Sequence, residues 1–477
     1  MKKIITIAIL VFTMNAFAQV TKLFDFDGTT NGSKPHYTNL IQASDGMLYG
    51  MTQTGGASNI GVLFQYNPTA NVYTKKFDFA GTTNGSTPYG SLMQASDGML
   101  YGMTSQGGAN SAGVLFQYNP ATNTYTDKLD FVAVAGSNGR IPLGSLMQAS
   151  DGMLYGMTEA GGIKDSGVIF QYNPSTSTYT KKIDFAGNTN GGYPVGSLMQ
   201  ASDGMLYGMT QNGGVNNWGT LFQYDPATNT LTKKFDFTDT ANGRIPTGSL
   251  MQASDGMIYG MTTGGGTIAE GVLFQYNPAT NTYTKKLNFG AGAATTGKFG
   301  YGTLMQATDG MLYGMTQSGG TSGRGNIFQY NPVTSTYTME FDFFGGTMGS
   351  STTGTLMQAS NGMIYGMANK GGTSTNCTGG CGTLFKYAGA AAGINQVTSN
   401  NVQVTIYPNP NNGSFVIETN IAEKQTVNVY DVNGKIVLSQ NINGKTTIDA
   451  STLNEGVYNI SIISNEGVVN KRVVIVK

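Results

Sequence analysis

The sequence predicts an all-β fold, a seven-bladed β-propeller closed by an N-terminal strand and followed by a small Ig-like β-sandwich. The first observation is one motif, Gly98-Met99-Leu100-Tyr101-Gly102-Met103-Thr104 in its second copy, which occurs seven times at intervals of 52 or 54 residues. A fixed period in this range is typical of stacked supersecondary units such as propeller blades. The seven copies directly follow Asp45, Asp97, Asp151, Asp203, Asp255, Asp309 and Asn361.

The second observation is that each repeat holds four short runs rich in aromatic and β-branched residues. In the second repeat these runs are 91–96, 99–104, 113–118 and 125–131, and Gly, Pro, Asn or Asp bounds each of them. Runs of this length and composition predict strands, and none is long enough for an amphipathic helix. The four predicted strands are named a, b, c and d in chain order.

The third observation is that the two ends of the array complement each other. A copy of run d, Thr21 to Phe26, precedes the first repeat, whereas the seventh repeat stops after run c at Tyr387. We therefore predict that residues 21–26 supply strand d of the seventh blade, which would hide two open strand edges. An open solenoid would more often end in atypical capping repeats.

Residues 1–18 have the pattern of a secretory signal peptide. Two lysines precede the apolar stretch 4–14, and Ala16-Phe17-Ala18 has the small-x-small pattern of a cleavage site. We expect cleavage between Ala18 and Gln19, directly before the closing strand. No other apolar run approaches the roughly 18 residues of a spanning helix, so no transmembrane segment is predicted.

The composition is that of an exported β-protein. Charged residues make up 11% of the chain, well below the roughly 25% of ordinary soluble domains. The formal net charge is zero, which gives no electrostatic reason to expect binding to nucleic acid or to an anionic membrane surface. The regular Phe, Tyr and Met positions argue against disorder. We expect residues 19–388 to form one monomeric propeller.

The two cysteines of the chain, Cys377 and Cys381, lie in a lengthened loop between strands b and c of the seventh repeat. In an oxidising compartment, two close cysteines in one loop predict a local disulfide. A metal site would need more ligands than the chain offers, because His36 is its only histidine. We predict no metal and no other cofactor.

The C-terminal part of the chain differs from the repeats. Residues 389–401 have the composition of a linker, and residues 402–477 form a repeat-free segment with predicted strands at 404–407, 414–418, 426–430, 435–439, 457–463 and 473–476. The pairs Asn433-Gly434 and Asn443-Gly444 are hairpin turn signals. About 75 residues with six or seven short strands predict a small β-sandwich.

This tail resembles a type A C-terminal sorting domain of the type IX (Por) secretion system of Bacteroidota. The resemblance is carried by Tyr407-Pro408-Asn409-Pro410, by Gly434-Lys435, and by Gly456-Val457-Tyr458. It implies passage into the periplasm and then export across the outer membrane by the type IX machinery. It further implies that the tail is removed and that the protein is attached to surface lipopolysaccharide or released outside the cell.

The array resembles the GloVer (Gloeo/Verruco) tandem repeat. The resemblance rests on the recurring Asp-Gly-x-Leu-Tyr-Gly, Gly-Gly and Gly-Val-Leu-Phe blocks. This resemblance implies an architecture and no particular chemistry.

The acidic residues that recur in every repeat are expected to be structural. Asp-Gly before the b strand is a favoured type I′ hairpin pair, and Asn361-Gly362 is the other favoured pair, which keeps the turn and discards the charge. The Asp inside run d alternates with apolar neighbours, so it should lie on the opposite side of the strand from the core. Ca²⁺ binding would require clustered oxygens that no Asp-x-Asp loop supplies.

The repeats differ in their b–c and d–a loops, which an antiparallel blade places on the same face of the disc. Rigid scaffolds commonly present binding loops in this way, and Tyr, Trp and Arg are frequent anchors of binding surfaces. Neutral drift in exposed loops is the alternative, and the sequence leaves it open. The predicted ligand-binding residues are His36, Tyr37, Tyr89, Arg140, Lys164, Asp165, Tyr193, Trp218, Arg244, Glu270, Tyr301 and Arg324.

The favoured function is a non-catalytic binding or adhesion module that recognises a glycan or a surface protein. A polysaccharide hydrolase is one alternative, since Glu159, Asp165 and Glu270 could supply the two carboxylates that it needs. A lyase, with a base such as His36 beside an arginine, is another. A purely structural surface component is the third. No nucleophile elbow, phosphate loop or metal motif is present in the sequence.

Overall fold

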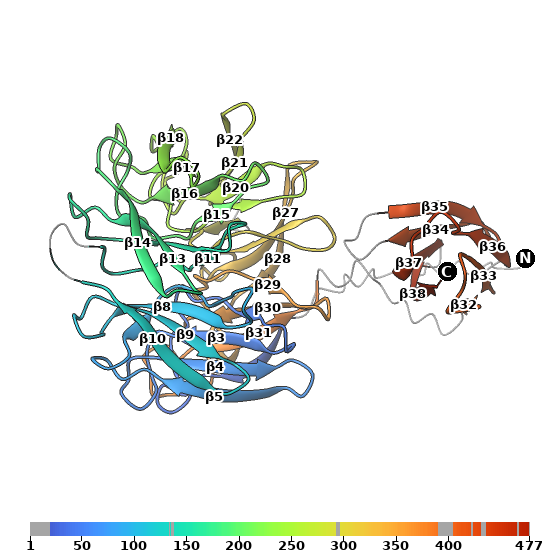
Figure 1. Cartoon of the computed structure of the whole chain (residues 1–477), viewed down its shortest axis with the longest axis horizontal. Helices are drawn as coiled ribbons and strands as arrows, with labels where there is room; N and C mark the ends of the chain where they lie inside the picture. The colour runs from blue at the N-terminus through green and yellow to red at the C-terminus, as the bar shows by residue number, and fades with distance from the viewer. Residues whose placement is uncertain are drawn as a thin grey trace, which may run out of the picture. The chain divides into compact units, whose positions relative to one another are not determined.

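The computed structural model describes residues 20–132, 134, 138–291, 296–389, 404–420, 423–430, 436–464 and 467–476. The predicted signal peptide with its cleavage site (Ala18, Gln19), nearly all of the predicted linker, and Gly434 and Lys435 lie outside these residues. The chain divides into two compact units, residues 1–390 and 391–477. Both consist of antiparallel strands (Figure 1).

In the first unit each repeat folds into one antiparallel sheet, in which a pairs with b, b with c, and c with d. Sheets 1 to 3 follow this order, and sheet 2 has an additional strand, β6 (Ser86–Pro88). Their strands are β2 (Ile41–Gln42), β3 (Leu48–Thr52), β4 (Val62–Asn67) and β5 (Val72–Asp78); β7 (Met93–Gln94), β8 (Leu100–Gln106), β9 (Val114–Asn119) and β10 (Thr124–Asp130); and β11 (Met147–Gln148), β12 (Leu154–Thr158), β13 (Val168–Asn173) and β14 (Thr178–Asp184).

Sheets 4 to 6 repeat the pattern, and a separate pair of short strands, β23 (Gly297–Lys298) and β26 (Ser318–Gly319), accompanies sheet 6. One short 3-10 helix, η1 (Gly346–Met348), follows sheet 6. The strands of these sheets are β15 (Met199–Gln200), β16 (Leu206–Thr210), β17 (Thr220–Asp225) and β18 (Thr230–Asp236); β19 (Met251–Gln252), β20 (Ile258–Met261), β21 (Val272–Asn277) and β22 (Thr282–Asn288); and β24 (Met305–Gln306), β25 (Leu312–Met315), β27 (Asn326–Asn331) and β28 (Thr336–Asp342).

Sheet 7 combines the two ends of the array. Its first three strands are β29 (Met357–Gln358), β30 (Ile364–Ala368) and β31 (Thr383–Tyr387), and the fourth is β1 (Val20–Asp25). Strands β1 and β31 pair antiparallel from Val20–Tyr387 to Asp25–Thr383. The N-terminal strand therefore occupies the position that strand d holds in the other sheets.

Neighbouring sheets are joined by hydrophobic clusters. In the described residues, seven such clusters link sheets 1 and 2, 2 and 3, and so on to 6 and 7, and the last links sheet 7 to sheet 1. The cluster between sheets 7 and 1 contains Phe26, Met367 and Leu384 together with Leu48 and Phe64. Full burial of an apolar side chain of this size contributes roughly 1.5–3 kcal/mol, so these clusters are the main source of stability.

Two circles of hydrogen bonds run through all seven repeats. In the first, the backbone N–H of Ser91 donates to Oγ of Ser145 at 2.7 Å, and each next repeat continues the series. The circle closes where Thr355 donates its N–H to Oδ1 of Asn39, which in turn donates to Ser91. The residues of this circle are 39, 91, 145, 197, 249, 303 and 355.

In the second circle, a glutamine of strand a joins its sheet to the preceding one. Oε1 of Gln94 accepts from the N–H of Ser44 at 2.7 Å, and its amide donates to Oγ of Ser44 at 3.0 Å. Oε1 of Gln42 accepts from the N–H of Ser360 at 2.7 Å, which connects the seventh repeat to the first. These side-chain bonds explain why strand a is only two residues long, shorter than the predicted run 91–96. Ser91 before β7 and Ser96 after it donate their N–H groups to the neighbouring sheet, to Ser145 and Gln148 respectively, instead of to strand b.

The a–b turn differs from the predicted type I′ geometry. Gly98 has φ +81°, whereas Asp97 is not in the left-handed region. The N–H of Gly98 donates to the carbonyl of Ala95 and that of Ala95 to the carbonyl of Met99, which is the pattern of a type I turn followed by a glycine bulge. Asp97 keeps a structural role, since its carboxylate accepts from the N–H of Met99 at 2.9 Å and from the hydroxyl of Tyr101 at 2.8 Å.

The second unit contains two antiparallel sheets that share one hydrophobic core. Phe415 and Ile448 of one sheet and Val427 and Ile460 of the other lie in the same buried cluster. The first sheet contains β32 (Val404–Tyr407), β33 (Ser414–Thr419) and β36 (Thr446–Asp449), and the second contains β35 (Ile436–Ile442), β34 (Gln425–Tyr430), β37 (Gly456–Ser464) and β38 (Gly467–Ile475).

Two sequence predictions for this unit need correction. Strand β36 was not predicted, and β38 begins at Gly467, earlier than the predicted residue 473. Of the tail motif, Tyr407 ends β32, Gly456 begins β37, and the buried Tyr458 donates its hydroxyl to the carbonyl of Asn454 at 2.9 Å. Within the described residues, no helix is long and apolar enough to cross a membrane.

Candidate functional site

The b–c and d–a loops of the first unit are bonded to each other, and together they form what we call the loop face. The N–H of Tyr193, in the d–a loop before sheet 4, donates to the carbonyl of Ser166 in the b–c loop of sheet 3 at 2.8 Å. The carbonyl of Tyr193 accepts from the N–H of Gln211 in the b–c segment of sheet 4 at 3.1 Å. Each d–a loop is therefore held between the b–c loops of two neighbouring sheets.

This clamp requires an unusual backbone conformation. The residue at the clamped position is left-handed in each d–a loop, including Ile141 at φ 57° and Ile245 at φ 55°. A β-branched residue in this region costs on the order of 1–3 kcal/mol and persists only where the surroundings enforce it. The loop face is thus a rigid surface that the two flanking hydrogen bonds hold in place.

The seven d–a loops converge on a small hollow of about 40 Å³. A hollow of this size holds only a few water molecules, so a ligand must lie on its rim instead of inside it. One residue from each loop lines it at the same position of the repeat, namely Tyr37, Tyr89, Leu143, Val195, Thr247, Tyr301 and Thr353.

The hollow is narrow because the loops touch through glycine backbone. A Cβ atom on Gly144 would lie 2.3 Å from the carbonyl oxygen of Gly196, and a Cβ on Gly196 would lie 2.3 Å from that of Gly248. Contacts below 3.0 Å do not occur for real Cβ atoms. Glycine follows six of the seven rim residues, Thr38 after Tyr37 being the exception, and it permits the close approach of neighbouring repeats.

Four of the predicted binding residues form an aromatic cluster, and three of them, the tyrosines, line this rim. Tyr37 stacks on Tyr89 with ring centroids 4.4 Å apart, and Tyr301 meets Tyr37 edge-on at 5.6 Å. The imidazole of His36 lies 3.9 Å from the ring of Tyr37. The four rings come from sheets 1, 2 and 6, and we call them the tyrosine cluster.

The phenols of the tyrosine cluster stay protonated at physiological pH. Burial raises the pKa of Tyr37 to about 12. Burial also raises the pKa of Tyr89 and of Tyr301. The cluster therefore offers neutral hydroxyl donors and acceptors beside apolar ring faces, all three phenolic side chains being partly exposed.

His36 makes the stability of the first unit depend on pH. Burial, together with the positive charges of Lys34 and Lys370, lowers its pKa from 6.5 to about 4, against a hydrogen bond with Gln53 that raises it. As the pH falls, the imidazole of His36 is therefore protonated in the unfolded chain before it is protonated in the folded chain. The contribution of His36 to stability is complete above pH 6.5 and is lost progressively towards pH 4.

We expect the variant His36→Gln to lose less stability than the unaltered protein when the pH falls from 7 to 5. His36 is the only histidine, and ordinary carboxylates titrate mainly below this window. Urea unfolding of both proteins at pH 7 and pH 5 measures the difference. An identical pH dependence in the two proteins would contradict the buried neutral imidazole.

The other charged residues predicted to bind ligand are mostly paired with one another. Arg140 donates to Asp165 with Nη2–Oδ2 at 2.8 Å, and Lys298 pairs with Glu270 at 2.8 Å. The guanidinium of Arg244 lies 4.8 Å from the Trp218 ring centroid, and its Nε lies 3.3 Å from Asp239. The contacts Arg140–Asp165, Lys298–Glu270 and Arg244–Trp218 each join a d–a loop to a b–c loop. The contact between Arg244 and Asp239 lies within one d–a loop. The structure therefore assigns these residues to the rigidity of the loop face.

Three further predicted residues lie apart from the tyrosine cluster. Tyr193 is 38% exposed, and Lys164 and Arg324 are exposed on b–c loops. The Arg324 carbonyl accepts from the N–H of Ser351, as the clamp of its loop requires. Tyr193 is bonded to the b–c loop of sheet 3 that carries Lys164, whereas Arg324 belongs to sheet 6.

The acids considered for hydrolysis are placed unfavourably for it. Asp165 belongs to sheet 3 and Glu270 to sheet 5, and each is held by a cation. The Arg140 guanidinium lowers the pKa of Asp165, while burial raises the pKa of Glu159. In the described part of the chain, no group of three or more His, Cys, Asp or Glu could hold a metal ion.

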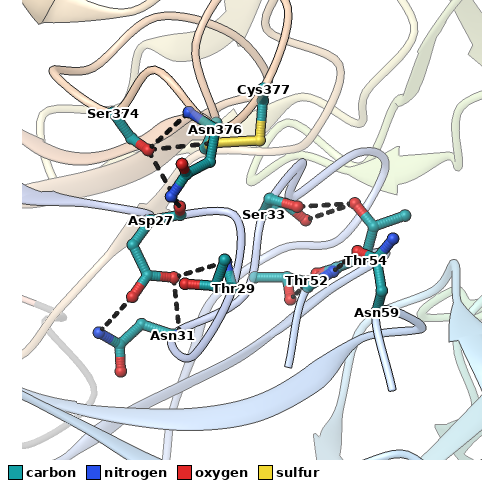
Figure 2. The surroundings of a disulfide bond; sticks show 12 residues. Asp27, Thr29, Asn31, Ser33, Thr52, Thr54, Asn59, Ser374, Asn376 and Cys377 are labelled. Carbon is teal, nitrogen blue, oxygen red and sulfur yellow. Dashed lines mark hydrogen bonds between the residues drawn. A yellow bond between two sulfur atoms is a disulfide. The ribbon is translucent and has the colours of Figure 1, made fainter. Parts of the chain in front are cut away.

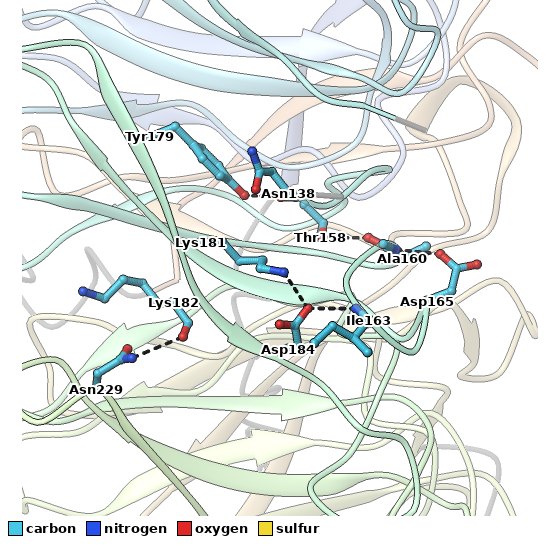
Figure 3. Close-up of polar contacts among 11 residues, drawn as sticks. Asn138, Thr158, Ala160, Ile163, Asp165, Tyr179, Lys181, Lys182, Asp184 and Asn229 are labelled. Carbon is cyan, nitrogen blue, oxygen red and sulfur yellow. Dashed lines mark hydrogen bonds and ion pairs between the residues drawn. The ribbon is translucent and has the colours of Figure 1, made fainter. Parts of the chain in front are cut away.

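The aspartates of strand d fasten that strand to the b–c loop of the same sheet. Oδ1 of Asp184 accepts from the N–H of Ile163 at 2.9 Å and from Nζ of Lys181 at 3.0 Å (Figure 3). The exception, Asn288, accepts from the N–H of Thr267 in the same way at 3.1 Å. The recurring acid is therefore structural, and its charge is dispensable.

The predicted cysteine pair, Cys377 and Cys381, forms a disulfide. Figure 2 shows the residues around this disulfide. Beside it lies a groove of about 740 Å³, which we call the disulfide groove. Sequence reasoning missed its residues, although the lengthened b–c loop of the seventh repeat was a signal for them. The disulfide groove is lined by Gly28, Thr29, Thr30, Ser33, Lys34, Thr54, Gly56, Ala57, Asn59, Lys75, Asn376, Cys377 and Thr378.

Models of two protein families match the sequence. The Gloeobacter/Verrucomicrobia repeat matches residues 10–138, 130–298 and 251–415, and the secretion system C-terminal sorting domain matches residues 405–476. Both resemblances seen in the sequence are thereby confirmed. The sorting domain indicates secretion to the cell surface or the extracellular space and an interaction with the secretion machinery.

Two similar solved structures are of the extracellular domain of BT4673 from B. thetaiotaomicron, assigned to a one-component system in one case and to a hybrid two-component system in the other. Sequence identity is 13% and 12%, the TM-score 0.50 and 0.53, and each match covers 96% of this chain. The chain spans 58% and 59% of their length. This likeness supports a propeller-like all-β fold. No curated protein matched the chain.

Proposed function

Because the chain belongs to the Gloeobacter/Verrucomicrobia repeat family and ends in a secretion system C-terminal sorting domain, we propose that it is an exported binding module. Its first unit is a seven-bladed β-propeller closed by β1, and its loop face recognises a glycan or a protein at the cell surface or outside the cell. The second unit is an Ig-like sandwich that delivers the propeller by way of the periplasm and is then removed.

The pairing of β1 with β31 supports a closed propeller. So do the cluster between sheets 7 and 1 and the two circles of hydrogen bonds that return from the seventh repeat to the first. A closed ring leaves no unpaired edge between its ends, which suits a protein that works outside the cell.

The observation that carries the binding role is the tyrosine cluster. Tyr37, Tyr89 and Tyr301 come from the loops of three different sheets, and none of them belongs to the hydrophobic clusters that join the sheets. Partly exposed rings with protonated hydroxyls combine an apolar face with a polar tip, which is the character of binding anchors. The rigid clamp of the d–a loops reduces the entropy lost on binding.

We expect Tyr37→Ala and Tyr89→Ala each to weaken ligand binding by about tenfold or more, the effect of losing a central aromatic anchor. The measurement is a screen of the purified protein against a broad panel of polysaccharides, followed by titration of each variant. Phe344→Ala is the matched control, because Phe344 is an aromatic residue of a d–a loop, 59% exposed and outside the cluster.

The same samples separate this proposal from its rivals. Shortening of the polysaccharide chains would show that the protein is a hydrolase or a lyase and not a binding module. Binding that survives both tyrosine substitutions would remove the cluster from the site. If the protein binds no polysaccharide of the panel and associates with itself, a structural surface component would be favoured.

A further inference from the structure

We propose that the disulfide groove is a second binding site and that it takes an acidic saccharide, a sugar residue carrying a carboxylate or a sulfate. The disulfide groove shares no lining residue with the hollow beside the tyrosine cluster, and its use does not depend on binding at that cluster. Its volume of about 740 Å³ is in the range of small-molecule sites, roughly 300–1,000 Å³.

The groove is lined by polar groups of the kind that bind sugar hydroxyls. The hydroxyls of Thr29, Thr30, Ser33, Thr54 and Thr378 and the amides of Asn59 and Asn376 line it. Hydroxyls both donate and accept, and amides present a donor and an acceptor side by side. No carboxylate side chain is among the lining residues, so nothing in the lining repels an anion.

The acids nearest to the groove are already engaged. The carboxylate of Asp27 accepts from the N–H of Thr29 at 2.9 Å and from the backbone and side-chain amides of Asn31 at 2.8 and 3.0 Å. Asp78 pairs with Lys75 at 2.6 Å. Neither acid forms an ion pair with Lys34, the remaining cation of the groove.

Lys34 presents this cation from a fixed backbone. Its N–H donates to the carbonyl of Cys381 at 2.8 Å, and its carbonyl accepts from the N–H groups of His36 at 2.7 Å and Gln53 at 3.1 Å. Its φ of 49° makes it the clamped residue of its d–a loop. The Lys34 side chain is exposed and takes part in none of the ion pairs of the described residues.

The disulfide builds the opposite wall of the groove. Ser374 and Asn376 donate to the carbonyl of Asp27 at 3.0 and 2.8 Å, which attaches the loop 373–381 to the d–a loop of sheet 1 (Figure 2). Gly28 packs directly against the disulfide, since a Cβ there would lie 2.6 and 2.7 Å from the two sulfur atoms. The extra length of this b–c loop thus produces a wall that the other repeats do not encode.

The test is a titration of the full-length protein with tetragalacturonate, with a sulfated galactan oligosaccharide and with neutral cellotetraose. We expect saturable binding of an acidic probe, weakened by added salt, and binding of cellotetraose at least about tenfold weaker. Lys34→Asn should weaken the acidic probe by about tenfold, since asparagine tolerates the left-handed backbone and removes only the ammonium group. Lys424→Asn, which removes an exposed lysine of the second unit, makes the same change in net charge and should leave binding unchanged.

A second variant tests the disulfide wall of the groove independently of Lys34. The double variant Cys377→Ser/Cys381→Ser removes the disulfide that holds this wall. We expect it to bind the acidic probe more weakly and to bind the ligand of the tyrosine cluster with little change. Equal binding of cellotetraose, unchanged binding by Lys34→Asn, or absence of binding to both acidic probes would each overturn the proposal. Equal binding of a polyglutamate peptide would overturn the saccharide assignment in favour of an acidic protein. If only the tyrosine variants lose binding, the proposed function survives and the groove proposal fails.

Discussion

Replacing Phe26 by alanine is expected to lower the free energy of unfolding by about 3–5 kcal/mol, the usual cost of removing a buried aromatic ring. Phe26 follows β1 directly and is fully buried, with its ring 5.6 Å from that of Phe64 in sheet 1. The loss is as large as this only if the N-terminal strand completes sheet 7. Urea unfolding of the purified protein measures it.

Phe79→Ala is the matched control, because Phe79 occupies the same position between sheets 1 and 2. It is also fully buried, and its ring lies 5.6 Å from Phe116. The two substitutions should cost about the same. If Phe79→Ala lowers the free energy of unfolding and Phe26→Ala does not, the N-terminal strand does not close the ring. Deleting residues 20–25 should destabilise further, because the whole edge of β31 becomes unpaired.

Deleting residues 467–477 is expected to abolish delivery to the cell surface and to leave the protein in the periplasm. The deletion removes β38, which pairs with β37 from Gly456–Ile475 to Ser464–Gly467 and contributes Val473 and Ile475 to the core of the second unit. Without β38 that unit loses one side of its larger sheet. Cell fractionation with an antibody against the first unit measures the distribution.

A substitution on the surface of the same unit provides the comparison for export. Lys424→Ala removes an exposed lysine that takes part in none of the ion pairs of the described residues, so export should persist. The melting of the first unit should be the same in both variants. Surface delivery of the truncated chain would refute the role of the tail in sorting.

The repeat made the sheets predictable from the sequence. The length and the apolar and aromatic composition of runs such as Val114–Asn119 predict strands, and the displaced run d before the first repeat predicts the pairing of β1 with β31. The turn at Asp97 was assigned the wrong type because Asp-Gly suits both a type I′ turn and a type I turn with a glycine bulge. Only the backbone torsions distinguish the two.

The candidate sites were predictable only in part. The non-repeated aromatics led to Tyr37, Tyr89 and Tyr301, because the repeat itself locates the rim position. Arg140 and Lys298 could not be separated from them, since sequence does not show that each already has an acidic partner. Thr29 and Lys34 belong to the disulfide groove through a loop from the other end of the array, and no local pattern reports such a contact.

The pairing of β1 with β31 also dictates an order of events during folding. Sheets 1 to 6 are built from hairpins close in sequence, whereas β1 and β31 stand at opposite ends of the array. Local hairpins form early, and a contact that closes so long a loop forms late. Strand β1 is therefore synthesised long before β31 and pairs with it late. During that interval the β1 of one molecule can complete sheet 7 of another, so we expect strand-exchanged dimers to be the characteristic by-product of folding at high concentration.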